Sequence, residues 1–147
     1  MSKSFTVFAG LLISTSAFAA GCPDFSGNYT NSTDKLSTPI AVSQTGCNEM
    51  DTSIYSVDVL SLKTDGVFRQ VRDKGQTELE KATFTADSLV GETVFTVPDE
   101  AGVQHFRTTK YTTVKSSGGD LVTTYTVYDQ QGNLVSQSGY TLTRKAQ

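Results

Sequence analysis

Short runs of alternating apolar and polar residues recur along the chain from about residue 25 to its end. A period of two is typical of β-strands that have one buried face. No window keeps a 3.6-residue apolar period, so no amphipathic helix is predicted. Nine segments carry the strand pattern: residues 25–31, 39–45, 54–62, 67–72, 78–86, 88–97, 103–115, 121–129 and 134–145.

The connections between these predicted strands are short and rich in turn-forming residues. Thr64-Asp65-Gly66, Pro98-Asp99-Glu100-Ala101-Gly102 and Ser116-Ser117-Gly118-Gly119 all favour tight turns. None is long enough to join parallel strands. The sequence therefore predicts an all-β fold built as a single antiparallel up-and-down meander. Because open sheet edges invite aggregation, we expect it to close into a barrel of about 8 to 10 strands, with a β-sandwich as the runner-up.

The N-terminal residues have a different pattern. A short, positively charged start precedes an apolar run, Phe5–Thr15, that is too short to span a bilayer. The small residues Ala17 and Ala19 then suit cleavage by a signal peptidase. We therefore predict a signal peptide over residues 1–19 and a single exported domain over residues 20–147, destined for the periplasm or for secretion.

The chain has two cysteines, Cys22 and Cys47. In an exported chain an even cysteine count predicts a disulfide, and closing this loop would contribute roughly 3.5 kcal/mol. As a minor alternative, the stretch from Ala19 to Cys22 resembles a bacterial lipoprotein signal, in which Cys22 would be acylated and would anchor the protein to a membrane. Leu is usual at the position of Ala19, and acylation would leave Cys47 unpaired.

Charge and residue content argue against several function classes. A formal net charge of −3 without a basic run offers no electrostatic footprint for nucleic acid. The single histidine, His105, and the absence of a Gly-x-Ser-x-Gly motif predict no catalytic site, no cofactor and no metal. Glu78 and Glu80 lie two apart on one strand face, and we interpret them as a solvated edge rather than as a pair of catalytic acids.

Several predicted strands have faces that mix aromatic, hydroxyl and basic residues, as expected of a lumen that holds an amphipathic ligand. A guanidinium inside a barrel could anchor a ligand carboxylate, with tyrosine hydroxyls as further donors. The candidate ligand-binding residues are Arg69, Arg107, Tyr111, Tyr125 and Tyr140. In the alternative arrangement these faces point outward, and Phe68, Phe84 and Phe106 fill the interior.

Residues at the two ends of the meander resemble the calycin superfamily, which includes the lipocalins and the fatty-acid-binding proteins. The first strand contains Gly27-Asn28-Tyr29, which is similar to the lipocalin opening Gly-x-Trp, and the last strand ends at Arg144. The resemblance implies that Arg144 packs across Tyr29 as a cation–π pair and seals one end of a barrel. Tyr29 departs from the pattern, since the family has Trp there and this chain has no Trp.

The resemblance implies a monomeric, non-enzymatic binding protein that holds a small apolar or amphipathic molecule, such as a lipid, in its lumen. The calycins also include inhibitors of enzymes. The alternative function is therefore a solid-core barrel that binds a protein partner through its loops, with the segment Ser32–Thr38 beside the predicted disulfide as the candidate loop.

Overall fold

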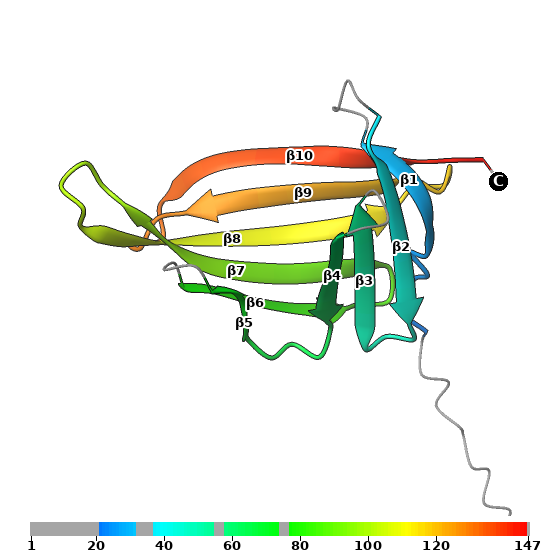
Figure 1. The fold of residues 1–147 in the computed structure, drawn as a ribbon, viewed down its shortest axis with the longest axis horizontal. Helices are drawn as coiled ribbons and strands as arrows, with labels where there is room; N and C mark the ends of the chain where they lie inside the picture. Colours follow the sequence, from blue (N-terminus) through cyan, green and yellow to red (C-terminus); the bar gives the residue numbers. More distant parts are fainter. Residues whose placement is uncertain (1–20, 32–36, 55–57, 74–76, 147) are drawn as a thin grey trace, which may run out of the picture.

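The computed structural model describes residues 21–31, 37–54, 58–73 and 77–146, and these form an antiparallel β-sheet of ten strands. The order across the sheet is β4-β3-β2-β1-β10-β9-β8-β7-β6-β5 (Figure 1). The strands are β1 (Gly27–Asn31), β2 (Pro39–Thr45), β3 (Glu49–Ile54), β4 (Asp58–Lys63), β5 (Arg69–Asp73), β6 (Thr77–Phe84), β7 (Ser88–Pro98), β8 (Gln104–Lys115), β9 (Leu121–Tyr128) and β10 (Leu134–Arg144).

The predicted all-β class and the antiparallel meander are confirmed. Neighbours in the sheet follow one another along the chain, except where β1 pairs with β10 and joins the two ends of the meander. One predicted strand, over residues 54–62, is wrong. It corresponds to the end of β3 and most of β4, which pair as a hairpin with Ile54 opposite Asp58.

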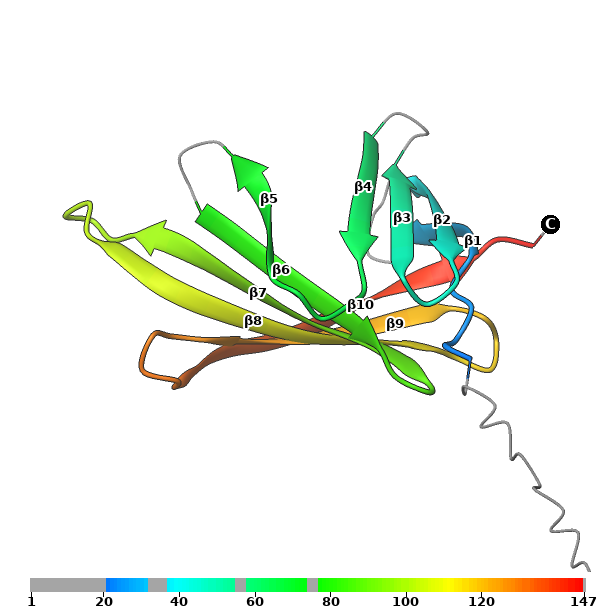
Figure 2. The ribbon, with the colours of Figure 1, turned by 90° about the horizontal axis from the view of Figure 1, so that it is seen from below.

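The predicted closure into a barrel is wrong, since the described sheet has two edges, β4 and β5. The connection between them pairs with β6 instead: Gly66 N–H donates to the carbonyl of Ala82 (2.8 Å), and Asp65 forms an isolated bridge with Thr83. A bulge between Gln70 and Arg72 then bends the short strand β5. The two edges therefore meet at one end and diverge from there, as Figure 2 shows.

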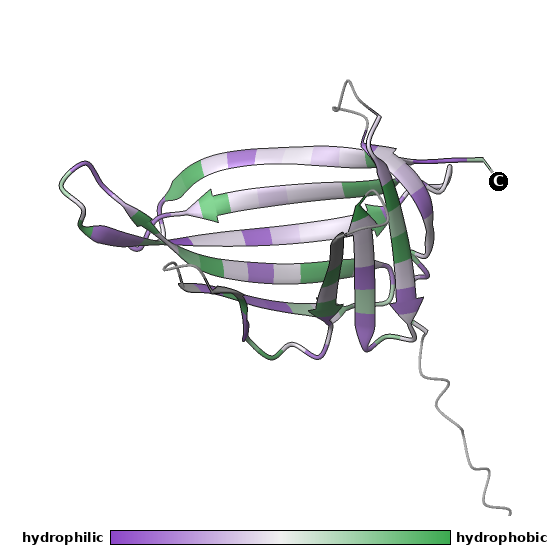
Figure 3. Ribbon diagram, viewed as in Figure 1, coloured by the Kyte–Doolittle hydropathy of each residue, from purple (hydrophilic) through white to green (hydrophobic). Residues whose placement is uncertain are grey.

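The sheet curls so that β1–β4 stand over one end of the long strands β7–β10 (Figure 2). The buried core lies between these two parts and consists of Phe25, Tyr29, Val42, Ala82, Leu89, Leu121 and Leu142. We call the face of the sheet that carries these side chains the inner face, and the opposite one the outer face. Apolar and polar residues are mixed along most strands, and β10 is pale over much of its length (Figure 3).

The disulfide between Cys22 and Cys47 is present, and it ties the segment before β1 to the turn between β2 and β3. Gln44 holds the same segment: its Oε1 accepts from Phe25 N–H (3.0 Å), and its Nε2 donates to the carbonyl of Pro23 (3.0 Å). A disulfide is compatible with an exported protein. The predicted signal peptide, residues 1–19, and most of the predicted binding loop, residues 32–36, lie outside the described residues.

Candidate functional site

The register of the strands shows which predicted site residues share a face, because residues directly opposite one another point to the same side. Tyr111 lies opposite Tyr125, and Tyr140 lies opposite the buried Thr123. Arg107 lies on the same face of β8, two alternate positions beyond Tyr111. The inner face therefore brings Arg107, Tyr111, Tyr125 and Tyr140 together on three adjacent strands.

The alternative arrangement, with three phenylalanines filling the interior, holds for one of them. Phe84 packs against the core, with its ring edge-on to Phe25 at a centroid distance of 5.6 Å. Phe68 and Phe106 remain 40% and 55% exposed. Phe106 lies opposite Thr96, on the outer face. The faces that mix aromatic and polar residues are therefore the inner ones.

The inner face has two parts, which differ in what covers them. At the covered end, Leu89, Leu121 and Leu142 belong to the buried core, against which Ile40 of β2, Met50 of β3 and Leu62 of β4 also pack. The open end is the remainder of this face on the long strands, and its side chains include Phe95, Arg107, Tyr125, Val127 and Tyr140. Tyr140 is 40% exposed, and every residue of β10 from Leu134 to Tyr140 is exposed.

A hydrogen bond between Tyr111 and Glu80 connects β8 to β6 across the intervening strand β7. The Tyr111 hydroxyl donates to Glu80 Oε1 at 2.8 Å. Its ring lies over Gly91 so closely that a Cβ at that position would stand 2.0 Å from ring atom Cζ. Gly91 is thus required by the close approach of the Tyr111 ring.

The surroundings of Glu80 disfavour its charged form. Burial raises the pKa of the Glu80 carboxyl, the hydrogen bond from Tyr111 lowers it, and the negative charge of Glu78 raises it, with a net increase. Burial and the nearby Glu80 carboxyl also raise the pKa of Tyr111. The interpretation of Glu80 as part of a solvated edge is therefore wrong, because this carboxyl is half-buried on the inner face and hydrogen-bonded.

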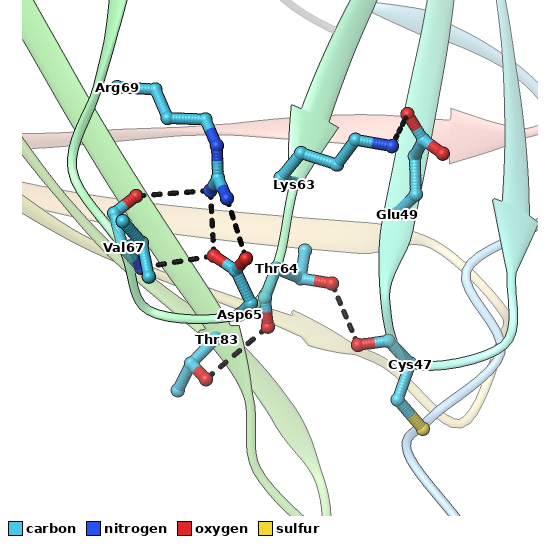
Figure 4. A network of polar contacts seen from close by, with 8 residues as sticks. All are labelled: Cys47, Glu49, Lys63, Thr64, Asp65, Val67, Arg69 and Thr83. Carbon is cyan, nitrogen blue, oxygen red and sulfur yellow. Dashed lines mark hydrogen bonds and ion pairs between the residues drawn. The ribbon is translucent and has the colours of Figure 1, made fainter.

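Arg69, predicted as a ligand anchor, is held by its own neighbours (Figure 4). Its guanidinium donates to Asp65 Oδ1 (2.7 Å) and Oδ2 (2.6 Å), and to the carbonyl of Val67 (3.2 Å). This hydrogen-bonded ion pair lowers the pKa of Asp65 well below its usual range. Arg69 therefore stabilises the connection between β4 and β5, beside the hydrogen bond from Thr64 to the carbonyl of Cys47 (2.7 Å).

Tyr29 and Arg144, the cation–π pair predicted at the two ends of the meander, lie on adjacent strands, but their side chains do not stack. Tyr29 and Arg144 are directly opposite in the ladder between β1 and β10. Tyr29 is fully buried and donates its hydroxyl to the carbonyl of Phe25 (2.8 Å). Arg144 extends over Gly119 instead, and the cation–π contacts of the described residues belong to Lys81 with Phe68 and Lys110 with Tyr128.

Gly27 has the structural role that its place beside Tyr29 suggests. A Cβ at Gly27 would stand 3.2 Å from atoms of the Tyr29 ring. This is tighter than an ordinary van der Waals contact, so a side chain there would press on the fully buried ring of Tyr29.

Two hollows in the surface lie away from the predicted ligand-binding residues. One, of about 380 Å³, is lined by Gly27, Asn28, Ala41, Val42, Ser43, Asp51 and Ser53, most of them on the outer face. The other, of about 400 Å³, lies beside Gly118, Arg144, Lys145 and Ala146. The ligand-binding candidates on the inner face thus form an open surface rather than the lining of either hollow.

His105, near the start of β8, contacts the carboxylate of Asp99 in the preceding turn, as a catalytic histidine would contact its partner. Its Nε2 is 2.9 Å from Asp99 Oδ2, and Asp99 Oδ1 accepts the N–H groups of Ala101 and Val103 at 2.9 Å each. These bonds shape the hairpin between β7 and β8. In the part of the chain that the structure describes, no group of three or more His, Cys, Asp or Glu side chains could hold a metal ion.

The described residues contain no helix that is long and apolar enough to cross a membrane. Comparison with protein-family models, with curated proteins and with solved structures finds no match for this chain. The calycin resemblance therefore rests on the residues of the first and last strands.

Proposed function

We propose that the mature chain is an exported binding protein that holds a small amphipathic ligand against the open end of its inner face. The observation that carries this proposal is the set of aromatic and polar side chains that core packing leaves uncovered there. Tyr140 is 40% exposed, and Phe95, Tyr125 and Val127 are half-buried rather than part of the core. Aromatic and apolar side chains that core packing leaves accessible beside polar ones are typical of a ligand-binding surface.

The order of residues along the inner face supports an amphipathic rather than a purely apolar ligand. Moving from the covered end, the face passes from Leu89 and Thr113 to Tyr111 and Tyr125. Beyond these rings it reaches Thr109 and then Arg107. A ligand could place its apolar part on the tyrosine rings and its polar group toward the charged side chains.

A neutral fluorescent probe, N-phenylnaphthylamine, tests the proposal, and the lack of Trp keeps the background emission low. We expect saturable binding to the mature protein. The variant Tyr125→Ser should bind about five- to tenfold more weakly, since an aromatic contact contributes about 1 kcal/mol. The control is Tyr128→Ser on the same strand, because Tyr128 lies opposite Thr108 on the outer face. Equal affinities in the two variants, or no saturable binding, would overturn the proposal.

A second candidate is a protein-interaction module, which the free strands β4 and β5 favour. In the described sheet each has one unpaired edge, and such edges can accept a strand from another chain. Leu60, on the edge strand β4, is 61% exposed. Sedimentation velocity tests this candidate: a concentration-dependent dimer that Leu60→Lys abolishes would support it, and a monomer at all concentrations would count against self-association through this edge.

A further inference from the structure

Several carboxylates outside the inner face pair with basic side chains. Glu49 accepts from Lys63 (2.5 Å) and Glu92 from Lys81 (3.1 Å), both pairs on the outer face. In the turns, Asp65 binds Arg69 and Asp99 binds His105. Four carboxylates away from the inner face, those of Glu49, Asp65, Glu92 and Asp99, therefore lie beside a basic side chain.

Glu80 differs from these carboxylates in both its surroundings and its partner. It is half-buried, and among the described residues its side-chain hydrogen bond comes from a neutral phenol, that of Tyr111. The register places Arg69 directly opposite Glu80, but that guanidinium is turned to Asp65. The adjacent residue, Lys81, points to the outer face and pairs with Glu92.

The side chains around Glu80 suit a positively charged ligand group. Glu78 lies two residues away on the same face and adds negative charge. The Tyr111 ring approaches over Gly91, and Phe95 lies diagonally opposite on β7, beyond Thr93. Aromatic rings attract organic cations through their negative faces, and a nearby carboxylate adds a direct charge interaction in a half-buried setting.

We infer that the ligand of the inner face carries an organic cation, an amine or a quaternary ammonium group, which pairs with Glu80 beside the Tyr111 and Phe95 rings. This inference rests on the proposed function and specifies the ligand class. It replaces the expectation that Arg69 anchors a ligand carboxylate, because Arg69 is already occupied by Asp65. Arg107, the other predicted anchor, lies opposite Phe95 and would favour an anionic ligand instead, which the anionic competitor below tests. The cation would compensate the half-buried negative charge of Glu80 that no described basic side chain contacts.

The test compares three amphiphiles with the same dodecyl chain, each below its critical micelle concentration, as competitors of bound N-phenylnaphthylamine. They are dodecyltrimethylammonium (cationic), dodecyl sulfate (anionic) and dodecyl maltoside (neutral). We expect the cation to displace the probe at a concentration about tenfold lower than the other two, as for one added charge interaction. In Glu80→Gln this preference for the cation over the neutral amphiphile should disappear.

Glu80→Gln suits this test because the amide oxygen can still accept the Tyr111 hydrogen bond, so the fold is kept. The matched control is Glu92→Gln on the outer face, which should retain the full cation preference. Binding of all three amphiphiles without charge preference, or a preference for the sulfate, would overturn this inference and leave the proposed function standing. Failure of the probe and of every amphiphile to bind would overturn both.

Discussion

The covered end and the open end of the inner face are built from the same strands, yet different interactions hold them. At the covered end, Leu89 of β7, Leu121 of β9 and Leu142 of β10 belong to the buried core, against which side chains of β2, β3 and β4 also pack. At the open end the same strands continue without a second layer above them, as the exposed run from Leu134 to Tyr140 shows. One sheet thus combines a packed core with an unpacked face.

The open end keeps its shape through its backbone ladder and its turns. Asp99 accepts two N–H groups in the turn between β7 and β8, and Asp129 accepts those of Gln131 (2.9 Å) and Asn133 (2.8 Å) in the turn between β9 and β10. Such side chains fix a turn without apolar burial. Core packing at the covered end does not account for the full length of these strands. The open end of the inner face is therefore where we expect the functional site.

The difference between the covered end and the open end can be tested by truncating one phenylalanine in each. Phe25→Ala removes a fully buried ring that contacts Phe84, so we expect a loss of about 3–5 kcal/mol in the free energy of unfolding. Phe95→Ala removes a half-buried ring of the open end and should cost about 1–2 kcal/mol. Urea unfolding followed by circular dichroism measures both, and equal losses would show that the distinction is mistaken.

Removing the disulfide tests the covered end alone. The double variant Cys22→Ser and Cys47→Ser should lose roughly 3.5 kcal/mol, because the unfolded chain regains the freedom of a 25-residue loop. Hydrogen exchange should speed up in β2 and β3 more than in β8 and β9. A loss below about 1 kcal/mol would mean that the Gln44 side chain holds the segment from Pro23 to Phe25 without the disulfide.

Gly91→Ala perturbs the boundary between the two regions, where Tyr111 crosses β7. The new methyl group would collide with the Tyr111 ring, so we expect a loss of about 1–3 kcal/mol in the free energy of unfolding. In a Tyr111→Ser background the same change should cost much less, because the ring is gone. Gly118→Ala serves as the control, since its nearest contact would be at 3.7 Å. Similar costs for Gly91→Ala in both backgrounds would contradict the proposed collision.

The smallest expected effect concerns the charge of Glu80 and depends on pH. Its pKa is raised in the folded protein, so the folded state holds this proton more tightly than the unfolded state does. Stability should therefore fall as the pH rises from the unfolded-state pKa of a glutamate through the folded-state pKa of Glu80. Glu80→Gln should raise the thermal midpoint slightly at neutral pH, and the gain should shrink in acid.

Among the charged groups near Glu80, Glu78 adds to this effect, while Arg69 is engaged by Asp65 and Tyr111 donates its hydrogen bond in either state. Glu92→Gln provides the reference for removing a carboxylate from the opposite face of the sheet. If the thermal midpoint of Glu80→Gln at neutral pH is lower than that of the unchanged protein, the Glu80 carboxylate stabilises the fold. That result would contradict the effect expected from its burial.

Periodicity in the sequence was sufficient to predict the class and the long strands, because a period of two is a local property. It failed at β3, where Glu49 and Asp51 dilute the alternation of Met50, Thr52 and Ile54. In the residues that follow, Tyr55-Ser56-Val57, a single turn-forming serine stands between two strand-forming residues, so the sequence signals a turn only weakly there.

Whether the sheet closes into a barrel, and what surrounds Glu80, depend on interactions between residues that are distant in sequence. Whether β4 meets β5 depends on the bend of β5 and on the pairing of Asp65 with Thr83, which no local pattern encodes. Glu80 looked like an exposed strand residue because its partner, Tyr111, lies 31 positions away. An isolated glycine within a strand pattern, Gly91, was the available signal that another group approaches closely there.

The pairing of β1 with β10 has a consequence for how this sheet assembles. It is the ladder that joins the two ends of the described chain, and the N–H of Lys145 also reaches the carbonyl of Asn28 (2.9 Å). Joining the ends near Cys22 and Lys145 and opening the chain between β4 and β5 would place the break where the sheet is already open. Every ladder would then connect successive strands, the mean sequence separation of contacts would fall, and we expect such a circular permutant to fold faster into the same sheet.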